Sequence, residues 1–166
     1  NLSNITVEEL SKIKGIGLAK ACRIISALEL GRRVSVASEM QKFKISSPQD
    51  IGNVYMEELR YKKKEIFRVV LLNTKNVIIG SKDISEGSLN ASIVHPREVF
   101  LEAIKKSANK MILMHNHPSG DPTPSSEDIN ITKRLISAGQ IVGIEILDHV
   151  IIGDGSFYSF KENGQI

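Results

Sequence analysis

Two histidines and one aspartate at close spacing are the residues of this chain best suited to hold a metal ion. His115 and His117 follow the apolar run 111–114, and Asp128 comes 11 residues after His117. In an extended chain, residues i and i+2 point to the same side, so both imidazoles can face one ion. Two nitrogens and a carboxylate oxygen fill three positions of a tetrahedral zinc and leave the fourth for water. The spacing therefore predicts one catalytic zinc per chain.

Hydrolysis at such a metal also needs a proton acceptor and a partner for the developing oxyanion. Zinc lowers the pKa of its bound water to about 7, which makes hydroxide available at neutral pH. Glu65, at the start of a predicted strand, is the candidate base if that strand lies beside the run 111–114. Ser125, three residues before Asp128, is interpreted either as a donor to the oxyanion or as the N-cap of the next helix.

Hydrophobic periodicity predicts helices and strands around these residues. In chain order we expect two helices within 5–33 with the second ending near Gly31, a helix from Pro48 to about Lys64, a hairpin of strands 66–72 and 77–79, a helix from Pro96 to about Ala108, a strand at 111–114, a helix from Ser125 to about Ala138, and strands at 144–147 and 150–152. This order implies an α/β fold in which a mixed sheet is flanked by helices. A linker between Val34 and Ser47 divides the chain into a small helical module, 1–44, and a second domain, 45–166.

The front module carries the basic excess of the chain. Residues 1–44 hold eight Lys or Arg against four Glu, whereas 45–166 hold 14 basic against 15 acidic residues. Hairpin amides and neighbouring cations can bind phosphates, so DNA is a candidate partner. The candidate nucleic-acid-binding residues are Lys14, Gly15, Gly17, Lys20 and Arg23. The alternatives are an ordinary solvated surface and a protein-docking hairpin.

Composition excludes several classes of protein. With 41% hydrophobic and 25% charged residues, the chain resembles globular proteins and not disordered or fibrous ones. A single cysteine, Cys22, rules out an internal disulfide and favours the cytoplasm, and we expect it to be buried. The chain starts at Asn1 without a signal peptide, which we interpret as a fragment of a longer protein.

The residues of the predicted site resemble a known family. His115-x-His117-x7-Ser125-x2-Asp128 with upstream Glu65 resembles the JAMM (MPN+) metalloprotease signature. The strings 94–98, 115–122 and 148–153 resemble the bacterial RadC proteins in particular, and the resemblance covers nearly the whole chain.

This resemblance implies a JAB/MPN fold for about residues 45–166, with a three-layer architecture like that of cytidine deaminases. It implies zinc held by the two histidines and the aspartate, with Glu65 as the general base; Glu57 or Glu58 would take that place if the strand began earlier. It also implies a helix-hairpin-helix module at the front, with 15–17 as its hairpin.

Two functions follow as hypotheses. The first is a zinc-dependent peptidase or isopeptidase acting on a peptide or isopeptide substrate. The second is a DNA repair or processing factor, in which the front module binds DNA and the metal site acts on nucleic acid or is regulatory. The complete ligand set argues against a scaffold without activity, and the sequence lacks the His-x-Glu and Pro-Cys-x-x-Cys patterns of zinc deaminases. His149 is interpreted as a structural residue or as a support for the site.

Overall fold

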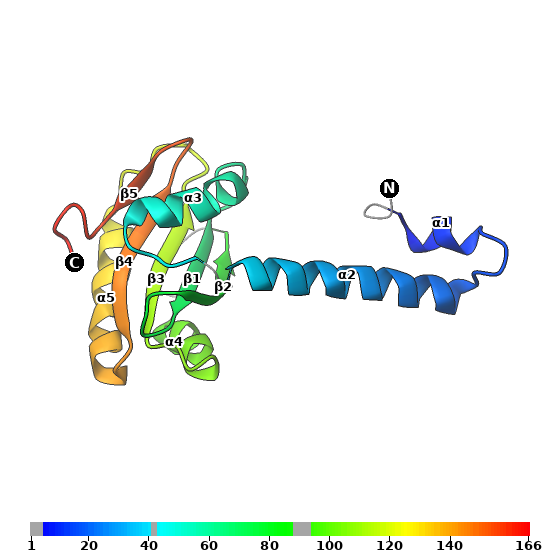
Figure 1. The fold of residues 1–166 in the computed structure, drawn as a ribbon. Coiled ribbons are helices and arrows are strands. Elements are labelled where there is room, and N and C mark those ends of the chain that lie inside the picture. The colour runs from blue at the N-terminus through cyan, green and yellow to red at the C-terminus, as the bar shows by residue number, and fades with distance from the viewer. Residues whose placement is uncertain (1–4, 41–42, 88–93) are drawn as a thin grey trace. The chain divides into compact units, whose positions relative to one another are not determined.

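The computed structural model describes residues 5–40, 43–87 and 94–166 (Figure 1). The chain divides into two compact units, Asn1–Met40 and Gln41–Ile166. The first unit is helical, and the second contains a sheet with helices on both faces. The separate folding of two domains with a boundary at residue 44 stays a prediction.

The first unit is a helical hairpin of α1 (Val7–Ser11) and α2 (Leu18–Met40). Thr6 caps α1: its hydroxyl accepts a hydrogen bond from the Glu9 amide, and the Glu9 carboxylate accepts one from the Thr6 amide. Leu10 and Ala21 are its buried side chains among those described.

Two expectations for this unit were wrong. Helix α2 continues through Gly31 to Met40, because an interior glycine costs only about 1 kcal/mol relative to alanine and α2 contains no proline. Cys22 is exposed, since only a narrow stripe of α2 faces α1. The predicted linker, 34–47, includes residues 41–42, which lie outside the described residues.

The second unit contains a five-stranded mixed sheet in the order β2-β1-β3-β4-β5. Its elements are α3 (Pro48–Leu59), β1 (Ile66–Leu72), β2 (Ile78–Glu86), α4 (Pro96–Lys105), β3 (Lys110–Asn116), α5 (Ser126–Val142), β4 (Glu145–Ile152) and β5 (Phe157–Ser159). Only β3 and β4 are parallel neighbours; the other neighbouring pairs are antiparallel. The predicted α/β fold class is thus confirmed.

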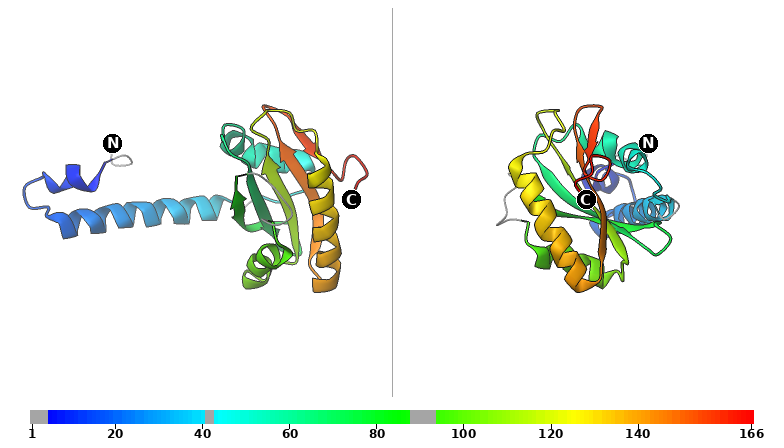
Figure 2. Two further views of the ribbon diagram at one scale, coloured as in Figure 1. Left: turned by 180° about the vertical axis from the view of Figure 1, so that it is seen from behind. Right: turned by 90° about the vertical axis from the view of Figure 1, so that its left-hand side faces the viewer.

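Helices cover both faces of this sheet (Figure 2). Helices α4 and α5 pack on one face, where Phe67, Leu113 and Leu135 belong to a common core. Helix α3 packs on the other face, with Ile51, Tyr55 and Leu59 fully buried. Because successive residues of a strand point to opposite faces, neighbouring residues of β3 face different helices. His115 therefore lies on the α5 face and Asn116 on the α3 face.

Two predicted elements differ in ways that matter for the site. Helix α3 ends at Leu59 and not near Lys64, because the carbonyl groups of Lys62 and Lys64 bind the buried side chain of Asn116 in a loop. The two strands predicted at 144–147 and 150–152 form the single strand β4. Its pairing with β3 shifts by one residue after Ile146, so β4 contains a bulge.

Candidate metal centre

Three predicted ligands meet where β3 ends and α5 begins. The Nε2 atoms of His115 and His117 lie 3.0 Å apart. The Asp128 carboxylate lies 3.2 Å from Nε2 of His115 and 3.5 Å from Nε2 of His117. Ligands about 2.1 Å from a tetrahedral zinc would lie about 3.4 Å from one another. The donor set and its spacing therefore fit a small metal ion, and one atom from each residue lies within 4.8 Å of the others.

His117 is oriented by a backbone carbonyl group. Its Nδ1 lies 2.7 Å from the carbonyl oxygen of Asp121, in the proline-containing loop that follows β3. A carbonyl oxygen only accepts hydrogen bonds, so Nδ1 carries a proton and the neutral ring has its lone pair at Nε2. The hydrogen bond to Asp128 raises the pKa of His117, and so does the hydrogen bond to the Asp121 carbonyl. Burial has the opposite effect but is outweighed. The metal would compete with a proton for this nitrogen.

His115 lies deeper than His117. It is fully buried, with its ring stacked on Phe67. Burial lowers the pKa of His115 and outweighs the effect of the nearby Asp128 carboxylate, which acts in the opposite direction. His115 is therefore neutral at pH 7, as a metal ligand must be.

Asp128 and Ser125 occupy the first turn of α5. Burial opposes ionisation of Asp128, but the neighbouring imidazole groups of His115 and His117 and the hydroxyl of Ser125 outweigh it and hold the pKa of the carboxyl well below its usual value. Ser125 is the N-cap: its Oγ accepts from the Asp128 amide at 3.2 Å, and its amide donates to Oδ2 of Asp128 at 2.7 Å. The Ser125 hydroxyl also donates to the same Oδ2 at 2.7 Å. Capping, one of the two interpretations of Ser125, is thus present, and it does not exclude the other.

Glu65 comes directly before β1, next to the group. Phe67 pairs with His115 across β1 and β3, and the alternation of side chains places Glu65 on the same face as Phe67. The negative charge of the Glu65 carboxylate also favours the protonated form of both histidines, which is a small effect that raises the pKa of each. The alternatives Glu57 and Glu58 are engaged elsewhere, in ion pairs with Arg60 and Arg68.

Asn116, between the two histidines, fixes the backbone on both sides of Glu65. Its Oδ1 accepts from the Ile66 amide at 2.9 Å, and its Nδ2 donates to the carbonyl oxygens of Lys64 at 3.1 Å and Lys62 at 3.4 Å. Sequence analysis missed this role, because the partners lie about 50 residues away in the chain.

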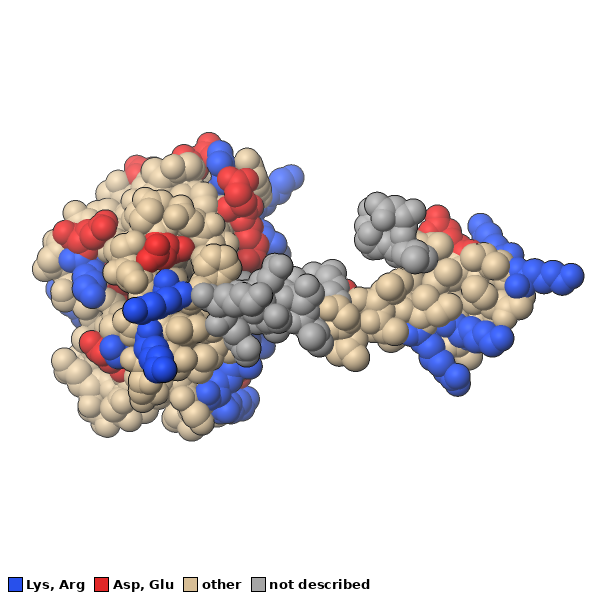
Figure 3. All heavy atoms as spheres, in the orientation of Figure 1, with Lys and Arg blue, Asp and Glu red and all other residues tan. Residues whose placement is uncertain are grey.

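The candidate nucleic-acid-binding residues belong to the first unit. They are separate from His115, His117 and Asp128, which together form the candidate metal group. All five, Lys14, Gly15, Gly17, Lys20 and Arg23, are exposed. Gly15 has a φ of +91°, and its carbonyl oxygen accepts a hydrogen bond from Nζ of Lys20 at 3.0 Å. Figure 3 shows several basic side chains on this unit. Such an exposed arrangement is compatible with phosphate contact and also with an ordinary solvated surface.

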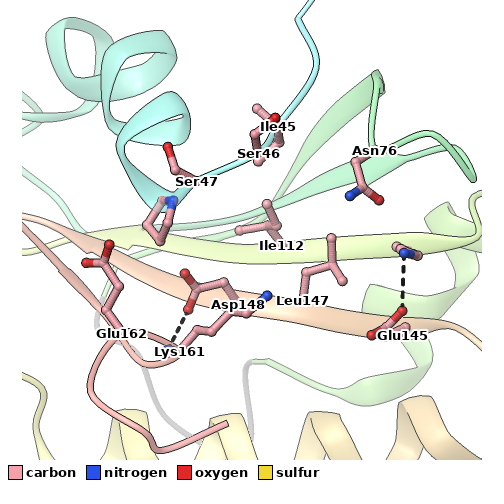
Figure 4. Close-up of a pocket in the computed structure, with 12 residues that line it drawn as sticks. Ile45, Ser46, Ser47, Asn76, Ile112, Glu145, Leu147, Asp148, Lys161 and Glu162 are labelled. Atoms are coloured by element: carbon pink, nitrogen blue, oxygen red, sulfur yellow. Dashed lines mark hydrogen bonds and ion pairs between the residues drawn. The ribbon is translucent and has the colours of Figure 1, made fainter.

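A cavity of about 390 Å³ lies on the other face of the sheet, beside the start of α3. Figure 4 shows Ser47, Ile112 and Asp148 among its lining residues. Asp148 is bound within the protein, since its carboxylate accepts hydrogen bonds from the Ser159 hydroxyl and from the amides of His149 and Lys161. This cavity is separate from the metal group.

The comparisons with known proteins agree with this geometry. Residues 45–165 match the model of the RadC-like JAB domain. A UPF0758 protein of Alkaliphilus oremlandii is 61% identical over 98% of this chain and 70% of its own length. One of Alkaliphilus metalliredigens is 58% identical over 100% and 72%, and one of Clostridioides difficile is 60% identical over 98% and 69%. In the described part of the chain, no helix is long and apolar enough to cross a membrane.

Proposed function

This chain belongs to the RadC-like JAB domain family, and from that premise we propose that it is a zinc-dependent hydrolase of the JAMM type. The observation that carries the proposal is the convergence of three acceptor atoms, two imidazole nitrogens and a carboxylate oxygen, within 4.8 Å. A divalent cation between these three atoms would bind all of them at once. A site with three protein ligands keeps a position for water, as catalytic zinc sites do.

Each residue of the group takes a defined role in this proposal. His115, His117 and Asp128 would hold the metal, which when bound acidifies water and polarises a carbonyl group. Glu65, beside them, would accept the proton of the attacking water. The Ser125 hydroxyl would turn from the Asp128 carboxylate to donate a hydrogen bond to the oxyanion.

We propose an amide as the substrate, in a peptide or an isopeptide. A carboxylate base and a Lewis acid address the two difficulties of amide hydrolysis, which are a weakly electrophilic carbonyl and a poor leaving group. The cytoplasmic location expected from the single cysteine is part of the same proposal.

The proposal is tested first by metal analysis of the purified chain, followed by a panel of peptide, isopeptide and DNA substrates. We expect about one zinc per chain and cleavage of an amide substrate. Glu65→Gln should retain zinc and lose at least about 100-fold in rate. Glu57→Gln is the matched control, because Glu57 pairs with Arg60 and should leave the rate unchanged.

Two results would contradict these assignments. Full activity of Glu65→Gln would remove Glu65 from the mechanism. A zinc-loaded chain that cleaves DNA and no amide would favour the second hypothesis over the peptidase.

Nucleic-acid binding by the first unit is the second candidate function. The exposed cations and the glycine-containing turn of this unit support it. Since Lys20 also binds the Gly15 carbonyl, Lys14→Ala combined with Arg23→Ala is the cleaner variant. Binding of a short labelled duplex at several salt concentrations should weaken and become less dependent on salt in this double variant.

The matched control removes the same charge from the second unit, by Lys62→Ala combined with Lys63→Ala. Equal losses of affinity in the two double variants would show general electrostatic attraction and would count against a specific role of the first unit.

A further inference from the structure

A continuous chain of hydrogen bonds runs behind the metal ligands. Nδ1 of His115 lies 2.9 Å from Nε2 of His149. Nδ1 of His149 lies 2.5 Å from Oγ1 of Thr132, and this hydroxyl lies 2.6 Å from the carbonyl oxygen of Asp128. All four residues are buried. The chain thus joins one proposed ligand to the backbone of another through two residues that do not belong to the ligand group.

The direction of every proton in this chain follows from its last member. A carbonyl oxygen only accepts, so the single hydroxyl proton of Thr132 is donated to Asp128. The Thr132 oxygen must then accept from His149, which places a proton on Nδ1 of His149. Nε2 of a neutral His149 is consequently an acceptor, and it can accept only from Nδ1–H of His115.

His149 is held in a setting that favours the neutral ring. It is fully buried, stacked on Phe160 with ring centroids 4.9 Å apart and in edge contact with Phe67. An imidazolium between two hydrocarbon rings would be poorly solvated. The surroundings of His149 therefore favour the neutral ring.

We propose that His149 and Thr132 are positioning residues that hold His115 in the Nδ1–H tautomer, so that its Nε2 lone pair points at the metal position. The proposal rests on the metal site of the proposed function but not on any particular reaction. The ion that this arrangement would bind is a divalent cation with affinity for imidazole nitrogen. The bound ring donates its other N–H inward, as metal-binding histidines commonly do, but here to a second imidazole.

The bulge in β4 is what brings His149 to this position. Met111 pairs with Ile146, but the next residue of β3, Ile112, pairs with Asp148, so Leu147 is the additional residue. A one-residue insertion exchanges the two faces for everything that follows it. His149 therefore pairs with Leu113 and lies on the α5 face, while Asp148 points to the cavity on the α3 face.

The first experiment reads the tautomers directly. Nitrogen NMR of the folded, metal-free protein with labelled histidine should show His115 and His149 both neutral, with the proton on Nδ1. Finding His115 with its proton on Nε2 would overturn the proposal. This readout needs neither metal nor activity.

The second experiment measures zinc affinity by competition with a chelator. Thr132→Val keeps the shape of the side chain and removes the hydroxyl, and we expect roughly tenfold or greater loss of zinc affinity. Thr132→Ser retains the hydroxyl and should keep the affinity within about threefold of the original. If Thr132→Ser keeps its zinc affinity, the loss in Thr132→Val is due to the missing hydroxyl and not to a general disturbance of the fold.

Ser159→Ala is the matched control for a lost buried hydroxyl. Ser159 donates to the Asp148 carboxylate at 2.6 Å, away from the ligand group, and its loss should leave zinc affinity unchanged. Equal zinc affinity in folded Thr132→Val and the original protein would overturn the positioning role. A chain with the expected tautomers and affinities that cleaves no amide would instead disprove only the proposed reaction.

Discussion

Each face of the sheet carries a group of charged side chains around a buried residue, Arg68 on one face and His115 on the other, and the two groups differ in how donors and acceptors are balanced. On the α3 face, Arg68 donates to Glu58 at 2.8 and 2.7 Å and to Asp83 at 2.5 and 3.1 Å. On the α5 face, Asp128 and two histidine nitrogens bring acceptor atoms together around one point. The Arg68 group, whose donors and acceptors match, serves the fold. A buried group with an excess of acceptors indicates a site for a cation.

The largest expected difference concerns the metal group. His117→Ala removes one of three ligands at a position that is only partly buried, so the chain should fold. Substitution of a residue that hydrogen-bonds to a metal ligand typically lowers metal affinity about 10- to 100-fold. Loss of a ligand itself should lower it more than about 100-fold. Chelator competition measures this, with His95→Ala, which removes the side-chain cap of α4, as a control that should bind zinc normally. Unchanged zinc affinity in His117→Ala would mean that His117 is not a ligand and that the α5 face holds no cation at this group.

A substitution in the Arg68 group should lower the stability of the fold and leave zinc affinity unchanged. Arg68→Met removes the hydrogen bonds of the buried guanidinium and leaves Glu58 and Asp83, which are about half exposed and can be hydrated instead, so the free energy of unfolding should fall by about 2 kcal/mol. Zinc affinity should stay the same, because Arg68 lies on the other face. Urea unfolding measures the change, with the exposed Arg97→Met, from a surface ion pair with Glu98, expected to cost less than about 0.5 kcal/mol.

Asn116 lies on the α3 face but binds the backbone beside Glu65, which lies on the α5 face. Its substitution should therefore affect both stability and the hydrolytic rate. Asn116→Ala leaves the Ile66 amide and the Lys64 carbonyl without their partner, which should cost about 2 kcal/mol of stability. The displaced Glu65 should lower the hydrolytic rate about tenfold while zinc affinity changes little. Urea unfolding, substrate assays and chelator competition check these three quantities. A zinc affinity as low as that of His117→Ala would mean that Asn116 acts on the ligands and not on Glu65.

The smallest effect concerns acid sensitivity of the metal-free protein. The folded-state pKa values of His115 and His149 are lowered, so the unfolded chain binds more protons once the pH falls below about 6.5. These two residues therefore remove stability between pH 7 and 5, whereas His117, with its raised pKa, adds some. Urea unfolding at both pH values should show a smaller loss in His149→Gln than in the original chain. Arg68→Met should lose as much as the original.

Local patterns were enough to predict that His115, His117 and Asp128 lie together, because the spacing that brings them together is local. His115 and His117 share a strand face at i and i+2, and Ser125 and Asp128 share the first turn of α5. Glu65 was predicted as the base on the condition that the hairpin of strands 66–72 and 77–79 lies beside the run 111–114, and β1 does pair with β3. The end of α3 was predicted wrongly, since the chain from 60 to 64 is compatible with a helix and only the distant Asn116 binds it in another form.

The sequence by itself determined the ligand types, their spacing and the alternation of helices and strands, since these depend on neighbours a few residues apart. Only the tertiary structure decided which face His149 occupies. A single bulge residue, Leu147, reverses the alternation of β4 and brings His149 behind His115 and beside Thr132. No periodicity in the residues around 147 marks that insertion, because the bulge is defined by pairing with β3, more than 30 residues earlier in the chain.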